Sequence, residues 1–251
     1  MIYDYLLNII SAKGAAYLIL LDPDKLAEDK IFPFVRHCEK CGVDGFLVGG
    51  SLITNGNFQH FLEKVKETTN LPAIIFPGGI EQISETADAI LYISVVSGRN
   101  PEHIIGKQVL AAPVIRKKKL EAISTGYMII ESSALTTAAY FSNSMPIPRN
   151  KPDIAAATAL AAEYLGMKMV YLEAGSGADL PVPFGMVKAV AEFCTVPIIV
   201  GGGIKNPQIA REMVNNGANI IVTGNFFEAE ENWNLIRNFS EAVHTKLSII
   251  T

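Results

Sequence analysis

Short apolar runs alternate with longer, mixed segments along most of the chain. Eight of these runs are rich in Val, Ile and Leu, and we predict them as strands: 17–21, 45–48, 73–76, 90–94, 127–131, 169–173, 198–200 and 220–223. Nearly continuous apolar character is typical of strands that are buried on both faces, as in parallel sheets. Helical segments between them supply the crossovers that a parallel sheet requires. The alternation therefore predicts an α/β fold, a (β/α)8 TIM barrel in a single domain over residues 1–251.

A doubly wound open sheet is the rival architecture. It usually carries a glycine fingerprint after its first strand, whereas Asp22 and Asp24 follow the first strand here and the glycine clusters come late in the chain. The length of 251 residues also suits one barrel. The segment between the third and fourth strands is too short for a full helix, and residues 141–153 are proline-rich without clear periodicity. We therefore expect a barrel with a degenerate third helix position and a mobile flap.

Composition limits the function of such a barrel. The chain is 49% hydrophobic and 18% charged, which supplies a large core and argues against disorder. Its net charge of −4 predicts no affinity for nucleic acid, because a duplex-binding protein carries a strongly basic face. The single dense basic run, RKKK at 116–119, is interpreted as a solvated helix end or loop. These properties favour a small-molecule site.

The cysteines and the N-terminal sequence bear on the location of the protein. Cys38, Cys41 and Cys194 are odd in number, which is unlike a disulfide framework. No second pair completes a zinc site with the C-x-x-C of Cys38 and Cys41, so we interpret it as helix packing. The N-terminus lacks the features of a signal peptide, and no apolar run reaches the roughly 18 residues of a membrane span. We predict a soluble, cytoplasmic protein.

Small or polar residues follow every predicted strand. In a barrel all of these strand ends converge on one face, the face on which the active sites of this fold lie. A single Gly-Gly pair is common in ordinary loops, so the convergence of all eight ends carries the prediction. In chain order the ends read DPD, GGS, PGG, SGR, ESS, EAGSG, GGG and GN.

The glycine clusters after the last three strands predict a phosphate site. GGGIKNP at 201–207 and GN at 224–225 precede helices, whose N-termini carry partial positive charge. GSG at 175–177 adds backbone N–H groups and a hydroxyl. The alternative is that these glycines only make tight turns. We predict that the three loops surround one anion, as phosphate sites of this fold do after the seventh and eighth strands.

Acidic residues lie on the opposite side of the predicted rim. Asp22 and Asp24, with the hydroxyl of Ser51, would suit Mg²⁺, which prefers oxygen ligands and shares phosphate oxygens with its substrate. An Asp-Pro-Asp turn is equally suited to capping a helix that begins near Lys25. Both readings stay open on the sequence alone.

Glu173 ends the sixth predicted strand, two residues after Tyr171. Strand residues two apart share a face, so both side chains are expected to point into the same site. A carboxylate at this place could accept a hydroxyl proton as a general base. The alternative role is a hydrogen-bond partner for the glycine loops, and one residue could fill both roles.

Five stretches of the chain together resemble the geranylgeranylglyceryl phosphate synthases and the related PcrB prenyltransferases. They are LLDPDK (20–25), FLVGGS (46–51), YLEAGSGA (171–178), VGGGIK (200–205) and VTGN (222–225). The resemblance covers nearly the whole chain, and YLEAGSG followed by GGGI and GN is specific. It implies a modified TIM barrel that joins sn-glycerol 1-phosphate to an isoprenoid diphosphate, geranylgeranyl diphosphate, with Mg²⁺. It also implies a homo-oligomer, a dimer or hexamer, whose lipid product would bring transient membrane association.

The resemblance also implies a role for individual residues. Asp22 and Ser51 would be the metal ligands, and Tyr171 and Glu173 would be catalytic. Some bacterial relatives have, at the position of Leu20, a lysine that helps to hold glycerol phosphate. Lys25 or another cation must take over that role here. Glycerol 1-phosphate would be held by Tyr171, Leu172, Glu173, Ala174, Gly175, Ser176, Gly177, Gly202, Gly203, Gly224 and Asn225, with Gly201 added on spacing alone.

Two other functions remain open on the sequence. A different phosphate-handling barrel enzyme, such as an isomerase or a lyase, would share the glycine loops but would not need Asp22 with Ser51. A non-catalytic phosphate-binding barrel would hold glycerol phosphate and turn nothing over. No residue pattern identifies the groove for a prenyl chain, so the chain length is not predicted.

Overall fold

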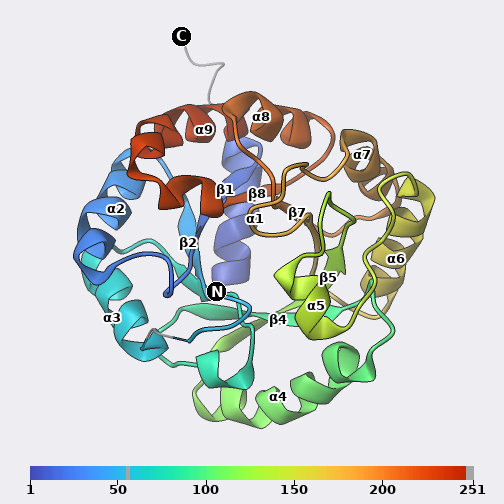
Figure 1. The fold of residues 1–251 in the computed structure, drawn as a ribbon, viewed down its shortest axis with the longest axis horizontal. Coiled ribbons are helices and arrows are strands. Elements are labelled where there is room, and N and C mark those ends of the chain that lie inside the picture. Colours follow the sequence, from blue (N-terminus) through green and yellow to red (C-terminus); the bar gives the residue numbers. More distant parts are fainter. Residues whose placement is uncertain (55–56, 247–251) are drawn as a thin grey trace.

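Eight parallel strands close into a barrel in chain order (Figure 1). The computed structural model describes residues 1–54 and 57–246, so residues 55–56 and 247–251 of the predicted domain lie outside the described part. The closed barrel confirms the predicted (β/α)8 fold. The strands are β1 (Ala16–Leu21), β2 (Gly45–Val48), β3 (Ala73–Ile75), β4 (Ala89–Val95), β5 (Glu121–Ile129), β6 (Met169–Glu173), β7 (Ile198–Gly201) and β8 (Ile220–Thr223).

Helices form a ring around the barrel, and α1 crosses the centre of the ring (Figure 1). Among the described helices, none combines the length and the apolar character that a membrane span needs. The α-helices are α1 (Ile2–Lys13), α2 (Glu28–Lys40), α3 (Phe58–Thr68), α4 (Lys107–Lys117), α5 (Thr137–Ser142), α6 (Pro152–Tyr164), α7 (Phe184–Phe193), α8 (Pro207–Asn215) and α9 (Ile236–Val243). Shorter helical turns are η1 (Ile80–Gln82), η2 (Glu102–Gly106), η3 (Asn225–Glu228) and η4 (Glu230–Leu235).

Alternate strand residues pack on the two faces of the barrel. Leu18, Leu47 and Ile74 belong to a buried cluster that fills the barrel. Their neighbours Ile19 and Val48 belong to a second cluster between the barrel and the helices. Because both faces are buried, the strands read as the continuous apolar runs on which the prediction depended.

Helix α1 covers the N-terminal end of the barrel. Leu6 of this helix is buried in the cluster that fills the barrel. Glu121, the first residue of β5, accepts hydrogen bonds from the backbone N–H groups of Ile2 and Tyr3, at 2.5 and 3.1 Å. N–H groups in the first turn of a helix have no partner within it, so Glu121 satisfies two of them.

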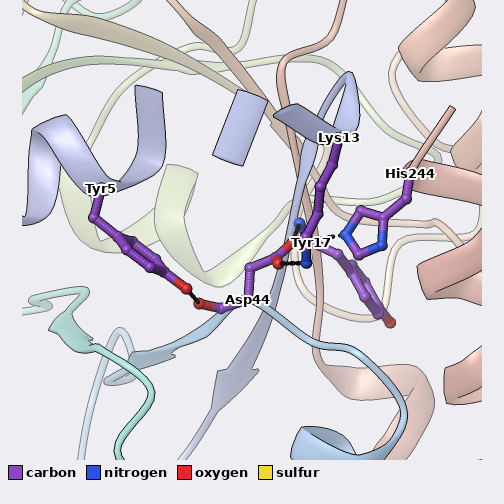
Figure 2. A network of polar contacts seen from close by, with 5 residues as sticks. All are labelled: Tyr5, Lys13, Tyr17, Asp44 and His244. Atoms are coloured by element: carbon purple, nitrogen blue, oxygen red, sulfur yellow. Dashed lines mark hydrogen bonds and ion pairs between the residues drawn. The ribbon is translucent and has the colours of Figure 1, made fainter. Parts of the chain in front are cut away.

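A buried polar network lies at this end of the barrel (Figure 2). Asp44, directly before β2, accepts hydrogen bonds from Lys13 Nζ at 2.5 Å, the Tyr17 backbone N–H at 2.8 Å and His244 Nε2 at 2.8 Å. Tyr5 donates its hydroxyl to the Asp44 carbonyl at 2.8 Å. Burial raises the pKa of Asp44, but these hydrogen bonds outweigh it and hold the pKa below its usual range. The network ties α1 and the end of α9 to the sheet.

The barrel has no α-helix between β3 and β4. Only η1 lies in this connection, and β3 pairs with β4 at two positions, Ile74 with Ala89 and Ile75 with Ile90. Strands β4 and β5 pair at seven positions. The predicted degenerate third helix position is confirmed.

Two sequence predictions about element boundaries were wrong. Strand β5 begins at Glu121, six residues before the predicted start, because the mixed run that contains Ser124 and Thr125 pairs with β4 despite its polarity. Helix α2 begins at Glu28, with Ala27 as its N-cap, so the Asp-Pro-Asp turn does not cap it.

Other segments lie where the sequence predicted. Cys38 is buried in the core and Cys41 ends α2, so the C-x-x-C is part of helix packing. The basic run ends α4, and Lys118 pairs with Glu85. Segment 141–153, predicted as a mobile flap, begins with the last two residues of α5, and in it Ile147 bridges to Ile130 and Pro152 begins α6. Its mobility stays a prediction.

Candidate active site

A cavity of about 580 Å³ lies at the C-terminal ends of the strands. Residues at or just after every strand of the barrel line it, from Leu20 of β1 to Asn225 after β8. The cavity therefore occupies the face on which the active sites of this fold lie. It has three parts: the glycine loops after β6, β7 and β8, the acidic side near β1 and β2, and an apolar arm along β4.

The glycine loops pack against one another so closely that a larger residue would not fit. A Cβ atom at Gly202 would lie 2.5 Å from Glu173 Oε1 and 2.6 Å from the Gly175 nitrogen. Gly175, Gly177 and Gly202 have φ of +107°, +71° and +83°, which glycine adopts readily and other residues rarely do. A Cβ atom at Gly177 would lie 3.4 Å from Asn225 Oδ1. The three loops thus converge on one place, as predicted from the sequence.

Glu173 lines the cavity at the C-terminal end of β6. Its side chain is 7% exposed, and its Oε1 accepts a hydrogen bond from the Gly175 N–H at 2.6 Å. Burial raises the pKa of Glu173 to about 7, although hydrogen bonds from Gly175 and Tyr171 lower it in part. A carboxylate with a pKa near neutrality is suited to accept a proton at working pH. The Gly175 N–H, one candidate ligand for the anion, is already bound to Glu173.

Tyr171 points to the same site as Glu173, which the two-residue spacing predicted. Its hydroxyl is hydrogen-bonded to Glu173, and burial together with the charge of Glu173 raises its pKa far above the usual range. A Cβ atom at Gly201 would lie 2.4 Å from this hydroxyl. Tyr171 is therefore a neutral donor that holds the carboxylate in place.

Asp22 and Ser51 both line the acidic side of the cavity. The prediction that this side lies opposite the glycine loops was wrong, because β1, which Asp22 directly follows, pairs with β8, and Leu20 lies against Gly224. Asp22 Oδ1 accepts a hydrogen bond from the Asp24 N–H at 3.0 Å, and burial raises the pKa of Asp22. Both carboxylate oxygens lie against Gly50, at 3.2 Å from where its Cβ would be. Asp24 points elsewhere, because its Oδ2 accepts hydrogen bonds from the N–H and hydroxyl of Thr54.

This donor set fits Mg²⁺ completed by substrate. In the described part of the chain, no three His, Cys, Asp or Glu side chains come together as a metal cage. Mg²⁺ is usually held by one or two carboxylates together with substrate phosphates and water. One carboxylate and one hydroxyl at the edge of an open cavity match that pattern.

The apolar arm of the cavity was not predicted from the sequence. It runs along β4 towards α4, on the side of the barrel that lacks a helix after β3. The absence of a helix after β3 was predicted correctly, but the cavity space that this absence opens was not predicted. The residues that line the arm are Phe76, Ile83, Ile90, Leu91, Tyr92, Ile93, Ala111, Ile115 and Tyr127.

Most predicted site residues line the cavity. Leu172 and Ala174 do not, because they alternate with Tyr171 and Glu173 and face the surrounding helices. Gly201 stays in β7 behind Tyr171. Those that line it are Asp22, Ser51, Tyr171, Glu173, Gly175, Ser176, Gly177, Gly202, Gly203, Gly224 and Asn225.

Leu20 also lines the cavity, close to Gly224. Lysines 25, 107 and 205 and His103 are the cationic or ionisable basic side chains among the described lining residues. Lys205 Nζ lies 3.4 Å from Asp179 Oδ1. The sequence analysis named Lys25, and Lys205 ends the motif VGGGIK, whereas Lys107 and His103 belong to no motif.

Comparisons with known proteins agree with this geometry. The geranylgeranylglyceryl phosphate synthase of Chitinophaga pinensis is 44% identical over 240 residues, which cover 95% of this chain and 94% of the relative. That of Korarchaeum cryptofilum is 45% identical over 217 residues, covering 86% and 89%.

Solved structures give the same result. The (S)-3-O-geranylgeranylglyceryl phosphate synthase of Thermoplasma acidophilum, crystallised with its substrate sn-glycerol-1-phosphate, has a TM-score of 0.88 at 31% identity, over 95% of this chain and 98% of that one. The Thermoplasma volcanium enzyme GGGPS has a TM-score of 0.91 at 31% identity, over 98% of both chains. The model of the PcrB family matches residues 8–243. This chain therefore belongs to the PcrB family.

Proposed function

We propose that the protein is a prenyltransferase, a geranylgeranylglyceryl phosphate synthase. It joins the free primary hydroxyl of sn-glycerol 1-phosphate to C1 of geranylgeranyl diphosphate, which forms an ether and releases diphosphate. The observation that carries this proposal is the position of Glu173. A buried carboxylate with a pKa of about 7 lies against the glycine loops, and its partner Tyr171 stacks on Phe76 of the apolar arm.

The glycine loops are proposed to hold the phosphate of glycerol 1-phosphate. Gly202, Gly203 and Gly224 line the cavity beside Ser176 and Asn225, and η3 begins at Asn225. Backbone N–H groups at such turns and the hydroxyl of Ser176 are suitable donors to phosphate oxygens. The hydroxyl end of the molecule then extends towards Glu173.

The donor is proposed to lie across the other half of the cavity. The acidic side takes the diphosphate, and the apolar arm takes the prenyl chain, which gains by leaving water. Asp22 and Ser51 would hold Mg²⁺. A bound Mg²⁺ would supply positive charge to the departing diphosphate. Lys25 lines the cavity and donates its backbone N–H to the Asp22 carbonyl at 3.0 Å, so it is a candidate for an added cation.

Proton transfer follows from the geometry of Glu173. The C1–oxygen bond of the donor breaks, and its electron pair leaves with diphosphate. The hydroxyl oxygen of glycerol phosphate forms the new bond to C1, and its proton passes to Glu173. Tyr171 and the Gly175 N–H keep the carboxylate aimed at that hydroxyl. General bases of this kind typically contribute about 10²- to 10⁴-fold in rate.

Gly202→Ala is expected to weaken binding of glycerol 1-phosphate at least tenfold by calorimetry. The added Cβ would lie 2.5 Å from Glu173 Oε1 and 2.6 Å from the Gly175 nitrogen, so the loops must move apart. Gly166→Ala is the matched control, because Gly166 has a similar φ of +84° but no heavy atom within 4 Å of its Cβ position. If both variants bind equally well, the glycine loops do not form the phosphate site.

Ala111→Phe tests the apolar arm. Ala111 lies in α4 and lines the arm, and a phenyl group there would fill part of it. We expect KM for geranylgeranyl diphosphate to rise more than fivefold while KM for glycerol 1-phosphate stays unchanged. Ala112→Phe, one residue further along the same helix and not among the lining residues, is the control. Equal effects of the two variants would contradict this placement of the chain.

The proposed function as a whole is tested with purified protein, Mg²⁺, glycerol 1-phosphate and prenyl diphosphates of graded length. We expect an ether-linked product with the geranylgeranyl donor. Formation of no ether from any donor would leave the two rivals, another phosphate-handling enzyme or a phosphate-binding protein.

We propose a homo-oligomer, a dimer or hexamer, and its support is the exposed apolar side chains on α6 and α7 and next to them, which include Tyr164, Leu165 and Phe193 at 80%, 77% and 57% exposure. A cytoplasmic enzyme whose lipid product brings transient contact with the membrane is consistent with the proposed chemistry.

A further inference from the structure

Three aromatic side chains form a cluster at the junction between the apolar arm and Glu173. This aromatic cluster consists of Phe76, Tyr127 and Tyr171. Phe76 and Tyr171 are stacked, with ring centroids 5.4 Å apart and planes 13° apart. Tyr127 packs edge-on against Tyr171, at 5.4 Å and 70°, and lies 5.9 Å from Phe76. All three rings line the cavity.

The cluster is placed by three strands. Phe76 directly follows β3, Tyr127 is in β5 and Tyr171 is in β6, so the rings meet across the mouth of the barrel. Tyr127 and Tyr171 are 7% and 1% exposed, and Phe76 is half-buried. The stacked pair uses one face of each ring. Phe76 is the most accessible of the three and lines the cavity, so it is the ring best placed to contact a ligand there.

The cluster is next to the reacting atoms of the proposed transfer. Tyr171 is hydrogen-bonded to Glu173. Burial raises the pKa of Tyr127, and the nearby charge of Glu173 raises it further. The hydroxyl that gives its proton to Glu173 must lie at this carboxylate. Since its oxygen bonds to C1 of the donor, C1 must come to the same place.

The transfer creates charge at this place. As the bond between C1 and the diphosphate oxygen breaks and the electron pair leaves with diphosphate, positive charge develops over the allylic carbons of the donor. The charge disappears when the hydroxyl oxygen bonds to C1 and its proton passes to Glu173. Groups that attract a cation but leave a neutral chain unaffected would act on the transition state alone.

We propose that the aromatic cluster stabilises this allylic cation, with Phe76 and Tyr127 as catalytic residues beside Glu173. Aromatic faces attract cations through the ring quadrupole, and the attraction is larger where water is excluded. A second carboxylate at this position would combine readily with the cation, whereas a ring combines with it far more slowly, because forming the bond would cost the ring its aromaticity. The rings thus fit a site in which the cation must survive until the hydroxyl attacks. This inference rests on the proposed function.

The test compares two prenyl analogues of the same shape. One carries a quaternary ammonium at the allylic position and the other a neutral quaternary carbon, and each is titrated calorimetrically in the presence of diphosphate and Mg²⁺. The wild-type protein is expected to bind the ammonium analogue roughly three- to thirtyfold more tightly, the range that a cation–π contact gives. Phe76→Leu and Tyr127→Leu should each reduce that ratio at least threefold.

Tyr127→Phe is the matched control, because it keeps the ring and removes only the hydroxyl. It should retain the wild-type ratio. The neutral analogue serves as the reference within each variant, so a general loss of packing does not change the ratio. If Tyr127→Leu fails to fold, the more exposed Phe76→Leu still decides the result.

The failure of this inference and that of the proposed function are distinguishable. An unchanged ratio in Phe76→Leu, in a protein that turns over the prenyl donor, would overturn the role of the rings. A wild-type protein that turns over no prenyl diphosphate would overturn the proposed function and this inference with it.

Discussion

Replacing Glu173 with Gln is expected to lower kcat by roughly 10²- to 10⁴-fold, the usual contribution of a general base. The amide has the same shape and can still accept the Gly175 N–H bond, so the loops should remain in place. The affinity for glycerol 1-phosphate, measured by calorimetry, should change little. Glu131→Gln is the control, because Glu131 also follows a strand but is exposed and binds Arg149.

The pH dependence of the same variant gives a second readout. Because Glu173 accepts a proton only when ionised and its pKa is about 7, kcat/KM should rise with pH and level off above that value. The rise should be absent in Glu173→Gln. A variant that retains full activity and the wild-type pH profile would remove Glu173 as the base.

The free energy of unfolding should fall as pH rises, in contrast to kcat/KM. A carboxyl group whose pKa is raised from 4.5 to about 7 on folding binds more protons in the folded state, so stability falls as pH rises between these values. Above neutrality this pKa shift lowers the free energy of unfolding by about 3 kcal/mol. Glu173→Gln should therefore be more stable than wild type at pH 8 in urea unfolding. A less stable variant would mean that the carboxylate is stabilised in some other way.

Asp44→Asn is expected to lower the free energy of unfolding by about 3–5 kcal/mol, as the loss of one partner from a buried ion pair does. Asp44 is 1% exposed, and the substitution leaves Lys13 and His244 without their carboxylate. Urea unfolding at pH 7 measures this loss. We expect activity per folded molecule to be unchanged, because the network lies at the end of the barrel opposite the cavity.

Asp88→Asn is the matched control for Asp44→Asn. Asp88 also precedes a strand, and it also binds a lysine and a strand N–H, but its side chain is 29% exposed. Its substitution should cost about 1 kcal/mol. Equal losses in the two variants would contradict the importance of burial in the Asp44 network.

Acid should remove the contribution of the Asp44 network to the free energy of unfolding. The pKa of Asp44 is lowered on folding, so its contribution to stability is present above the unfolded pKa of 3.8 and is lost as pH falls below it. The stability difference between wild type and Asp44→Asn should therefore narrow in this acidic range.

The sequence predicted the site best at positions where a single physical reason explains the residue type. The glycines at 175, 177 and 202 could be placed because their positions after strands, in a barrel, bring them together. The pair Tyr171 and Glu173 could be placed because strand residues alternate. The same alternation explains why assigning the whole motif 171–177 to the site included too many residues, since Leu172 and Ala174 face the helices.

Other parts of the site depend on contacts between distant segments. The apolar arm arises because the β3–β4 connection lacks a helix, while its walls come from β4, β5 and α4. Phe76 and Tyr127 are ordinary strand residues in the sequence and become a cluster only through closure of the barrel. Asp24 resembled a metal ligand or a helix cap, but the fold uses it to hold Thr54.

The central claim is that the hydroxyl oxygen of glycerol phosphate attacks C1 of a prenyl donor. The direct measurement uses sn-glycerol 1-phosphate labelled with ¹⁸O in its primary hydroxyl, with geranylgeranyl diphosphate and the purified protein, followed by mass spectrometry. We predict that all of the label is in the ether of the lipid product and none is in the released diphosphate. An unlabelled product, or label in the diphosphate, would contradict the mechanism.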